Sequence, residues 1–334
     1  MASNTSLKKL AFDNTQENVE MRTVYNDTLM DLAENNSNIV ILDADLMGCV
    51  GTRVFAKKYP DRSINCGIQE ANMIGVASGL SLMGKIPFAH SFGTFVTRRT
   101  YDQIFISAAY AKLNVNIIGS DPGITASLNG GTHMSFEDMG IMRCVPNATI
   151  LEPTDTVMLR CLLNEMANDY GIHYMRLVRK NAMKVYREGE KFKIGKAAIL
   201  KDGTDVTIIA SGYCVAESIK ACIALEKIEI SVRLINMFTW KPIDEEAIIQ
   251  AAKDTGAIVT AENHNVINGL GSAVSEVLVK NYPVPVEMIG TQDEFGEVGP
   301  IDYLAKRYHM RDKDIVEAAK KVVLRKPGDL CHAN

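Results

Sequence analysis

The chain has 334 residues, of which 47% are hydrophobic and 23% are charged, and its formal net charge is −4. This composition is typical of a globular protein large enough for two domains, and it offers no basic surface for nucleic acid and no cationic face for a membrane. Seven cysteines without a CxxC pair favour a reducing compartment. Because the sequence also shows no signal peptide and no apolar run of membrane-spanning length, we expect a cytoplasmic enzyme or subunit.

Short β-branched runs alternate with stretches of helical periodicity along the chain. Strands are predicted at residues 38–45, 115–121, 148–153, 205–212, 231–237 and 257–263. Helices are predicted at residues 20–35, 69–83, 101–112, 155–169, 214–226, 244–254 and 269–281. Apolar strands that alternate with helices favour parallel sheets covered on both faces. With the charged segment 184–194 as an exposed connector, the pattern predicts two doubly wound α/β domains, at residues 15–183 and 195–325.

Polar residues gather where the predicted strands end. Asp43 and Asp45 follow the first strand, Ser120 and Asp121 follow the second, and the run 262–264 follows the last. Ligands of open α/β sheets bind at the carboxyl ends of the strands. Each of these residues taken alone also suits a helix cap or a turn.

One acidic residue stands at the start of an otherwise small and apolar run. In GIQEANMIGVASGL, at residues 67–80, Glu70 is followed by a pattern that suits a tightly packed helix. A carboxylate buried at the start of such a helix costs free energy unless another group pairs with it. A glutamate that merely complements the helix dipole is the structural alternative.

Five motifs in order resemble the C-terminal half of transketolase, and the resemblance is closest to the second subunit of split, two-polypeptide transketolases. The motifs are DADL (43–46), GIQEANMIGVASGL (67–80), FGTFVTRRTYDQI (92–104), GGTHMSFEDMGIMRCVPN (130–147) and ENHNVINGLGSAV (262–274). The resemblance spans about residues 20 to 325. It implies a pyrimidine-binding domain followed by a transketolase C-terminal domain. It also implies thiamine diphosphate-dependent transfer of a two-carbon ketol unit from a ketose to an aldose.

The resemblance assigns roles around the cofactor. Glu70 matches the catalytic glutamate that hydrogen-bonds N1′ of the aminopyrimidine and so activates the cofactor. Phe92 and Phe95 match positions that form the aminopyrimidine pocket, for which flat apolar walls are suited. Asp45 and Gln69 match positions near the cofactor.

The resemblance also assigns roles on the substrate side. His133 matches a catalytic histidine that hydrogen-bonds the sugar near the reacting carbonyl. Arg22 and Arg179 match arginines that bind the terminal phosphate, for which the guanidinium fork is suited. His90 and Asn129 complete the expected substrate contacts.

Two positions depart from the family pattern. Asn129 stands where an aspartate usually contacts a substrate hydroxyl, and Cys49 stands where a serine usually contacts the phosphate. A thiol is a poor hydrogen-bond donor. A ketose with another anionic end, such as a sulfonate, or a branched sugar is consistent with these changes. Arg176 and Lys180 are alternative cations for the anionic end.

The partner is inferred from what the sequence lacks. The GDG motif and the later asparagine pair, which hold the metal and the diphosphate in this family, are absent. We therefore expect no metal ligands here, and we expect Mg²⁺ or Ca²⁺ to be held mainly by an N-terminal transketolase subunit. Two copies of each chain would form a heterotetramer, with homodimerisation through this chain. The expected substrate is a sugar phosphate or a similar anionic sugar.

Two other functions stay open. A 2-oxo-acid dehydrogenase beta subunit has a similar length and domain order, but GGTH and the candidate arginines favour a sugar substrate. A non-catalytic transketolase-like subunit is the second alternative, and the presence of Glu70, Phe95 and His133 argues against it. No GxGxxG follows the first strand, which argues against a nicotinamide cofactor.

Overall fold

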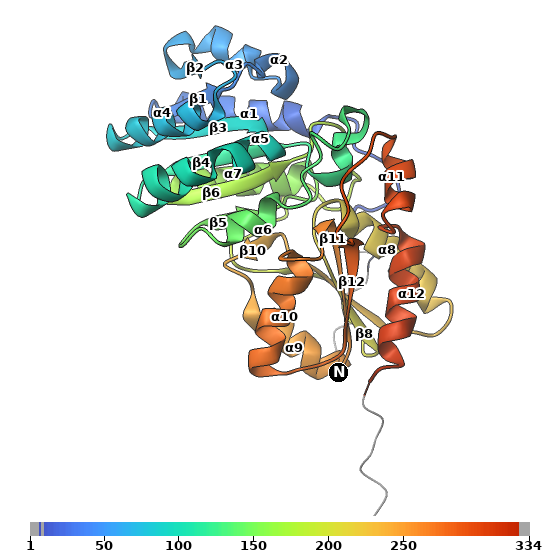
Figure 1. Cartoon of the computed structure of the whole chain (residues 1–334). Helices are drawn as coiled ribbons and strands as arrows, with labels where there is room; N and C mark the ends of the chain where they lie inside the picture. Colours follow the sequence, from blue (N-terminus) through green and yellow to red (C-terminus); the bar gives the residue numbers. More distant parts are fainter. Residues whose placement is uncertain (1–6, 8–9, 327–334) are drawn as a thin grey trace, which may run out of the picture.

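The structure, a computed structural model, describes residues 7 and 10–326. These residues form two α/β units, each built around its own sheet (Figure 1). The first sheet has seven strands and the second has five. Within the described part of the chain, no helix is both long and apolar enough to cross a membrane.

The first sheet is parallel except at one edge. Its strands lie in the order β10-β5-β6-β4-β3-β1-β2. They are β1 (Ile39–Asp43), β2 (Ser63–Asn65), β3 (Ile86–Phe92), β4 (Val115–Ser120), β5 (Thr149–Leu151), β6 (Ile172–Leu177) and β10 (Thr239–Lys241). Strand β10 is antiparallel to β5 and comes from the second half of the chain. The second half of the chain therefore completes the first sheet.

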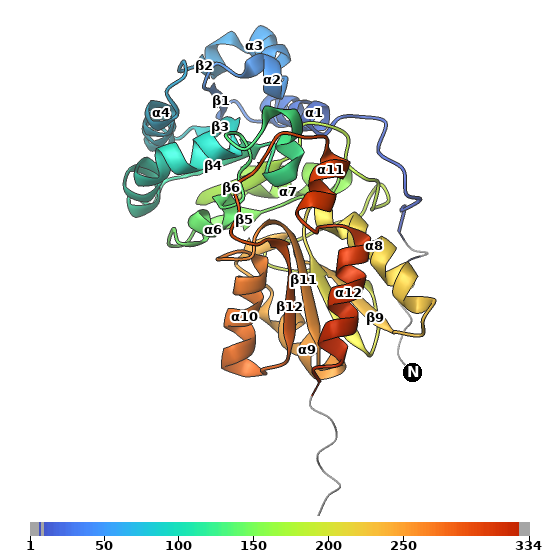
Figure 2. The same cartoon turned by 45° about the vertical axis from the view of Figure 1, so that its right-hand side comes forward.

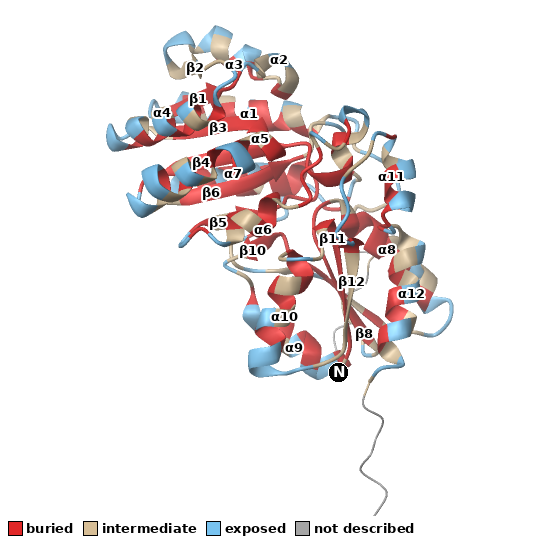
Figure 3. Cartoon of the chain, viewed as in Figure 1, coloured by how far each residue is buried: buried red, intermediate tan, exposed pale blue. Residues whose placement is uncertain are grey.

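Helices cover both faces of the first sheet. One face carries α1 (Met21–Asn35) and α7 (Thr156–Asn168), and the other carries α4 (Glu70–Leu82), a π-helix (Gln103–Tyr110) and α6 (Asp138–Arg143). Ile39 and Ile41 of β1 join the core beneath α1 and α7. Val40 and Leu42 join the core beneath α4. Because successive side chains point to opposite faces, a strand covered on both sides is buried along its length, as β4 and β6 are (Figure 3).

Shorter elements connect these layers. They are α2 (Met47–Val50), α3 (Arg53–Lys58), α5 (Gly93–Thr97) and 3-10 turns at Pro60–Arg62, Arg98–Thr100 and Gly123–Asn129. Most of them follow the carboxyl ends of strands. They therefore surround the edge of the sheet at which ligands are expected.

The second unit repeats the layered arrangement. Its sheet has the order β12-β11-β8-β9-β7, with only β7 antiparallel to its neighbour. The strands are β7 (Ala198–Lys201), β8 (Val206–Ala210), β9 (Val232–Asn236), β11 (Ile258–Asn265) and β12 (Val286–Thr291). The helices are α8 (Tyr213–Glu226), α9 (Glu245–Thr255), α10 (Leu270–Asn281), α11 (Ile301–Arg307) and α12 (Asp312–Val323). Because α8 and α12 cover one face and α9 and α10 the other, the prediction of two doubly wound domains is confirmed.

A buried ion-pair network joins the two units. Arg176 of β6 is 1% exposed and donates to Asp138 at 2.9 Å and to Glu152 at 2.8 Å. It also donates to the carbonyl oxygen of Asn263 in β11 at 3.0 Å, and Ser211 of the second unit donates to Glu152. Arg176 is thus enclosed between carboxylates, and it is not available to bind a substrate.

The segment between β12 and α11 reaches from the second unit to the first (Figure 2). Its Gly299 carbonyl oxygen accepts a hydrogen bond of 2.9 Å from Ser127 Oγ. A Cβ atom added to Gly131 would lie 2.1 Å from the carbonyl oxygen of Gly296. The glycine at position 131 is therefore needed for the close approach of this segment to the loop that carries His133.

All the predicted strands and helices form, with one change of helix type and several additions. The helix expected at 101–112 forms as a π-helix at Gln103–Tyr110. The sequence did not predict β3, which lies at the centre of the first sheet between β1 and β4. Pro87 within that strand removes one backbone donor and weakens the strand pattern.

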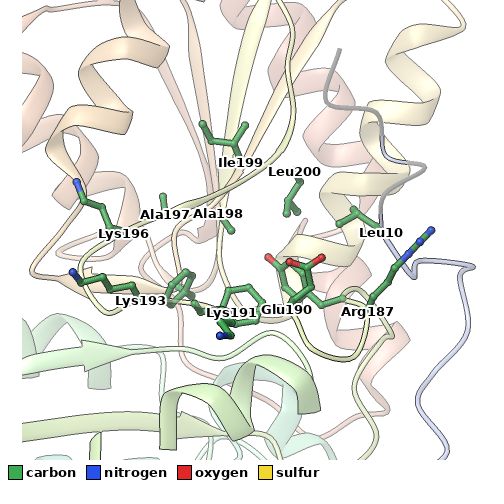
Figure 4. A pocket seen from close by; sticks show the side chains of 13 residues that line it. Leu10, Arg187, Glu190, Lys191, Lys193, Lys196, Ala197, Ala198, Ile199 and Leu200 are labelled. Carbon is green, nitrogen blue, oxygen red and sulfur yellow. The ribbon is translucent and has the colours of Figure 1, made fainter. Parts of the chain in front are cut away.

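The segment 184–194 is more buried than the predicted exposed connector. Val185, Tyr186 and Phe192 are buried in the core, because Asp155 accepts from the backbone amides of Val185 and Tyr186 and anchors the segment. The charged side chains around them line a cavity of about 370 Å³ against β7 (Figure 4). Val185, Tyr186 and Phe192 therefore turn inward, whereas residues 187–191 between them are exposed, as expected of a connector.

Candidate active site

The candidate site lies at the carboxyl ends of β1, β3, β4 and β6. These strands are neighbours in the parallel part of the first sheet. Their ends bring together residues that are far apart in the sequence, including Cys49, Phe92, Asp121 and Arg179. This is the edge at which open α/β sheets bind ligands.

Glu70 is buried and paired at the start of α4. Its side chain is 3% exposed, because the small apolar residues behind it pack α4 closely on the sheet. Ser91 Oγ donates to Glu70 Oε1 at 3.1 Å, and Arg99 Nη1 donates to Oε2 at 3.0 Å. The carboxylate also benefits from the N-terminal end of the helix dipole. A buried carboxylate with one donor on each oxygen retains lone pairs for a further partner.

Three aromatic rings form a cluster that Arg99 links to Glu70. The ring centroids of Phe92 and Phe95 each lie 5.0 Å from that of His133, in edge-on geometry. The Arg99 guanidinium carbon lies 3.8 Å from the Phe95 centroid. The cluster offers flat apolar surfaces next to a carboxylate, which suits a heteroaromatic ring that carries a hydrogen-bonding nitrogen.

The surroundings of His133 favour the uncharged form of its imidazole. Burial, together with the guanidinium groups of Arg99 and Arg179, lowers the pKa of His133 below its ordinary value. Its Nδ1 atom lies 2.9 Å from Thr132 Oγ1. A neutral imidazole can donate or accept a proton at a substrate oxygen.

Two arginines converge on Cys49. The backbone N–H of Arg22 donates to the carbonyl oxygen of Arg179 at 3.3 Å, which places the two residues side by side. Arg22 Nη1 donates to the Cys49 carbonyl oxygen at 2.9 Å, and Arg179 Nη1 contacts Cys49 Sγ. The Arg179 guanidinium carbon also lies 5.2 Å from the Phe92 centroid. The arginine pair is therefore continuous with the aromatic cluster.

Two carboxylates accompany these arginines. Asp121 is 2% exposed and accepts from Arg179 Nε. Glu20 accepts from Arg22 Nε at 2.5 Å and from Lys180 Nζ at 3.0 Å. Burial raises the pKa of Asp121 to about 6, and the adjacent Arg179 opposes that rise.

Two family profiles match the sequence in chain order. The first, "Transketolase, pyrimidine binding domain", covers residues 17–184, and the second, "Transketolase, C-terminal domain", covers residues 195–315. Together they account for most of the chain.

The chain belongs to the transketolase family. It is 49% identical to the 6-deoxy-6-sulfo-D-fructose transketolase subunit SqwH of Clostridium sp. (strain MSTE9), over 92% of this chain and 95% of that protein. It is 35% identical to an apulose-4-phosphate transketolase subunit of Phocaeicola vulgatus, over 91% of this chain and 98% of that protein. A solved structure described as "Split gene transketolase, inactive beta4 tetramer" superposes with a TM-score of 0.87 at 40% identity, covering 92% of this chain and all of that one.

These matches define the coarse function. The chain is a transketolase subunit, a transferase that works with a partner subunit and assembles into an oligomer. The cofactor of the transketolase family is thiamine diphosphate. A dehydrogenase beta subunit and a non-catalytic subunit are not favoured, because the full-length relatives are transketolase subunits.

The structure brings together most of the residues predicted for this transketolase site. Glu70, Phe92, Phe95 and His133 lie in one cluster, and Arg179 joins it to Arg22. The other predicted cofactor residues, Asp45 and Gln69, are exposed, as is the predicted substrate residue Asn129. Within the described part of the chain, their side chains form no hydrogen bond with this cluster. Asp45 instead pairs with Asn65 at 3.3 Å.

His90 lies deeper than its predicted role requires. It is fully buried, and its Nε2 atom lies 2.7 Å from Asp43 Oδ2 and 3.3 Å from Thr52 Oγ1. Its Nδ1 atom has no partner among the residues that the structure describes. His90 thus links the ends of β1 and β3 in this structure, and its contact with the sugar stays a prediction.

Two site residues were missed from the sequence. Ser91 and Arg99 donate to Glu70, yet neither was singled out. Ser91 lies in the unpredicted strand β3, and Arg99 is the second of two adjacent arginines in FGTFVTRRTYDQI. The pairing of Glu70 could have been sought among the cations of that motif, since a buried carboxylate requires one.

Proposed function

We propose that Glu70 of this transketolase subunit activates thiamine diphosphate by a hydrogen bond to its aminopyrimidine. The observation that carries the proposal is the buried Glu70 carboxylate beside the Phe92, Phe95 and His133 rings. The residues fit the group, since both oxygens of Glu70 retain lone pairs and the Phe rings offer stacking surfaces. When bound, thiamine diphosphate supplies the carbon nucleophile that breaks the bond between carbons 2 and 3 of the ketose.

The residues around Glu70 support its proposed role in holding a proton that it shares with the cofactor. Its shielding from solvent keeps a shared proton from exchanging freely with water, and Ser91 and Arg99 fix the orientation of its oxygens. His133, held neutral, is positioned to exchange a proton with an oxygen of the sugar. The two groups thus handle protons at different points around the aromatic cluster.

The arginines support an anionic sugar. Arg22 and Arg179 direct their guanidinium groups to Cys49. Arg179 also contacts the Phe92 ring, so the two arginines lie on the side of Phe92 that is away from Glu70. The relative SqwH is named for 6-deoxy-6-sulfo-D-fructose, and another relative is named for apulose 4-phosphate. We propose that the donor is a ketose with an anionic terminus, and that a sulfonated ketose is the leading candidate.

The surface of α4 supports assembly through this chain. Gly75 and Gly79 are exposed, and a Cβ atom added to either would meet open space. Each interior glycine destabilises a helix by about 0.5–1 kcal/mol relative to alanine. Two glycines that face outward are therefore suited to a close approach by another chain. Exposed apolar residues adjoin them: Ile68, Leu82, Met83, Ile106 and Tyr110. We propose that two copies of this chain dimerise through this surface.

We also propose that the partner subunit holds the metal and the diphosphate, and that the enzyme works in the cytoplasm.

Reconstitution tests this function. The chain is mixed with the companion subunit, thiamine diphosphate and Mg²⁺, and transfer of a two-carbon unit from 6-deoxy-6-sulfo-D-fructose to an aldose phosphate is measured. We expect activity only in the mixture, and a loss of about 10²–10⁴-fold in Glu70→Gln. The matched control Glu34→Gln removes an exposed carboxylate that pairs with Lys58 and should leave activity unchanged. Full activity of Glu70→Gln would refute the proposed role.

A further inference from the structure

The group of side chains around Cys49, which we call the recess, carries paired charges of both signs. Arg179 is paired with Asp121, and Arg22 is paired with Glu20, which also binds Lys180. Three cations and two carboxylates therefore leave this recess with one net positive charge. The exposed Arg53 guanidinium lies nearby, against Gly48, and solvent screens it. Lys180 is also exposed, but it is counted because it pairs with Glu20.

Each guanidinium still has donors to offer. The Nε and Nη1 atoms of Arg22 and Arg179 are engaged by carboxylates and by Cys49. Within the described part of the chain, no acceptor lies at hydrogen-bond distance from the Nη2 atom of either arginine. The recess is thus equipped to bind an anion, but its charge is already largely compensated.

We infer that Asp121 is a specificity-determining residue that makes the recess prefer a monoanionic sulfonate to a dianionic phosphate at the end of the ketose. This inference rests on the proposed function. A sulfonate carries one negative charge, whereas a phosphate monoester carries about 1.5 to 2 at pH 7. A recess with one net positive charge neutralises the sulfonate, but it leaves one charge of the dianion uncompensated next to the Asp121 carboxylate, which already pairs with Arg179.

Asp121 affects the choice of anion more than Glu20 does, because Asp121 is more deeply buried. Its side chain is 2% exposed, whereas that of Glu20 is 26% exposed. A charge acts more strongly where solvent is excluded. Asp121 also adopts a left-handed backbone conformation, with φ of 53°, directly after β4. Its N–H donates to the Leu177 carbonyl oxygen at 2.9 Å, which fixes the residue next to the strand end from which Arg179 follows.

Cys49 is consistent with the same preference. Its sulfur faces Arg179 at the position where a hydroxyl donor would strengthen the binding of a phosphate. A thiol donates only weakly. The recess therefore lacks both the charge and the donor that a dianionic phosphate would use.

The test compares two donors that differ only in the terminal group, 6-deoxy-6-sulfo-D-fructose and D-fructose 6-phosphate, with the reconstituted enzyme. Wild type should favour the sulfonate in kcat/KM by at least about tenfold. Asp121→Asn keeps an acceptor for Arg179 Nε and removes the charge. It should lower KM for the phosphate by about tenfold with kcat nearly unchanged, because the change acts on binding of the remote end. The matched control Asp61→Asn, an exposed residue before β2, should keep the wild-type ratio.

A ratio that Asp121→Asn leaves unchanged, or a wild-type enzyme that prefers the phosphate, would overturn the inference while leaving the transketolase function intact. Transfer from neither donor would instead count against the proposed donor. In that case thermal unfolding of the chain itself, with ethanesulfonate or ethyl phosphate added, decides the inference. A larger stabilisation by ethanesulfonate that reverses in Asp121→Asn supports it, and equal shifts for the two anions contradict it.

Discussion

Arg99 and Glu70 form the ion pair that closes the candidate site, with 3.0 Å between Arg99 Nη1 and Glu70 Oε2. The carboxylate is buried, but the Arg99 side chain is 47% exposed, and its guanidinium carbon lies 3.8 Å from the Phe95 ring centroid. Arg99 therefore reaches from the surface over an aromatic face to orient a buried acid. It is a positioning residue for Glu70.

Replacing Arg99 should reduce activity without unfolding the protein. Arg99→Met keeps an apolar side chain over Phe95 but leaves Glu70 with Ser91 as its remaining side-chain donor. A charge-assisted hydrogen bond at a half-exposed donor is worth about one power of ten, so kcat should fall by about tenfold. The adjacent Arg98, which pairs with Glu137, gives the control variant Arg98→Met. Equal effects of the two substitutions on kcat would contradict the positioning role.

Asp121 makes donor binding depend on pH. Because burial raises the pKa of Asp121 to about 6, its carboxylate takes up a proton as the pH falls from about 7.5 to about 5.5. The positive charge facing the donor then rises by one unit, so KM for a sulfonated ketose should fall by about threefold or more. The sulfonate itself does not titrate in this range.

The variant Asp121→Asn separates this effect from other titrations. His133 also lies within reach of the Arg179 charge, and it is present in the variant. The pH dependence of KM in Asp121→Asn should therefore lack the contribution that protonation of Asp121 makes in wild type. Parallel pH profiles of KM for wild type and variant would show that Asp121 does not contribute.

Arg176 should be important for stability. It is 1% exposed between Asp138 and Glu152, so Arg176→Met leaves two buried carboxylates without their cation. The free energy of unfolding should fall by about 3–5 kcal/mol, measured by urea denaturation. Arg160→Met removes a half-exposed arginine 4.0 Å from Asp31 and should cost less than about 1 kcal/mol. A small loss in both variants would mean that the buried network contributes little.

A bulky residue on α4 should separate assembly from folding. Gly79→Leu fills open space in the isolated chain and improves helix propensity, so the thermal stability of the monomer should stay equal or rise. The same side chain would block the close approach of another copy. Mass photometry should then show smaller assemblies than wild type. An unchanged distribution of masses would place the interface elsewhere.

The resemblance to transketolase was the basis for grouping the main residues of the site. Glu70, Phe95 and His133 occur in three different motifs and Arg179 lies outside the motifs, but in the structure each follows the carboxyl end of a parallel strand. The alternation of strands and helices places those ends on one edge of the sheet. The strand-end rule alone was not enough to group these residues, because β2, β3 and β6, which precede Glu70, Phe95 and Arg179, were not predicted.

Side-chain direction could not be predicted in the same way. Arg98 and Arg99 are adjacent in sequence, and only the local backbone decides that Arg99 reaches Glu70 while Arg98 reaches Glu137. His90 was assigned to the substrate, yet alternation along β3 turns it inward to Asp43, while Ser91 turns to Glu70. Because the strand itself was not predicted, its alternation could not be used to orient these two side chains.

The proposed control of the cofactor's proton by Glu70 is tested most directly by following that proton. The C2 proton of thiamine diphosphate bound to the reconstituted enzyme is exchanged against deuterated water, quenched with acid and measured by NMR. We predict that Glu70→Gln slows this exchange by about 10²-fold or more, while Glu34→Gln exchanges at the wild-type rate. Equal exchange rates for Glu70→Gln and wild type, with the cofactor bound to both, would contradict the proposed role of Glu70.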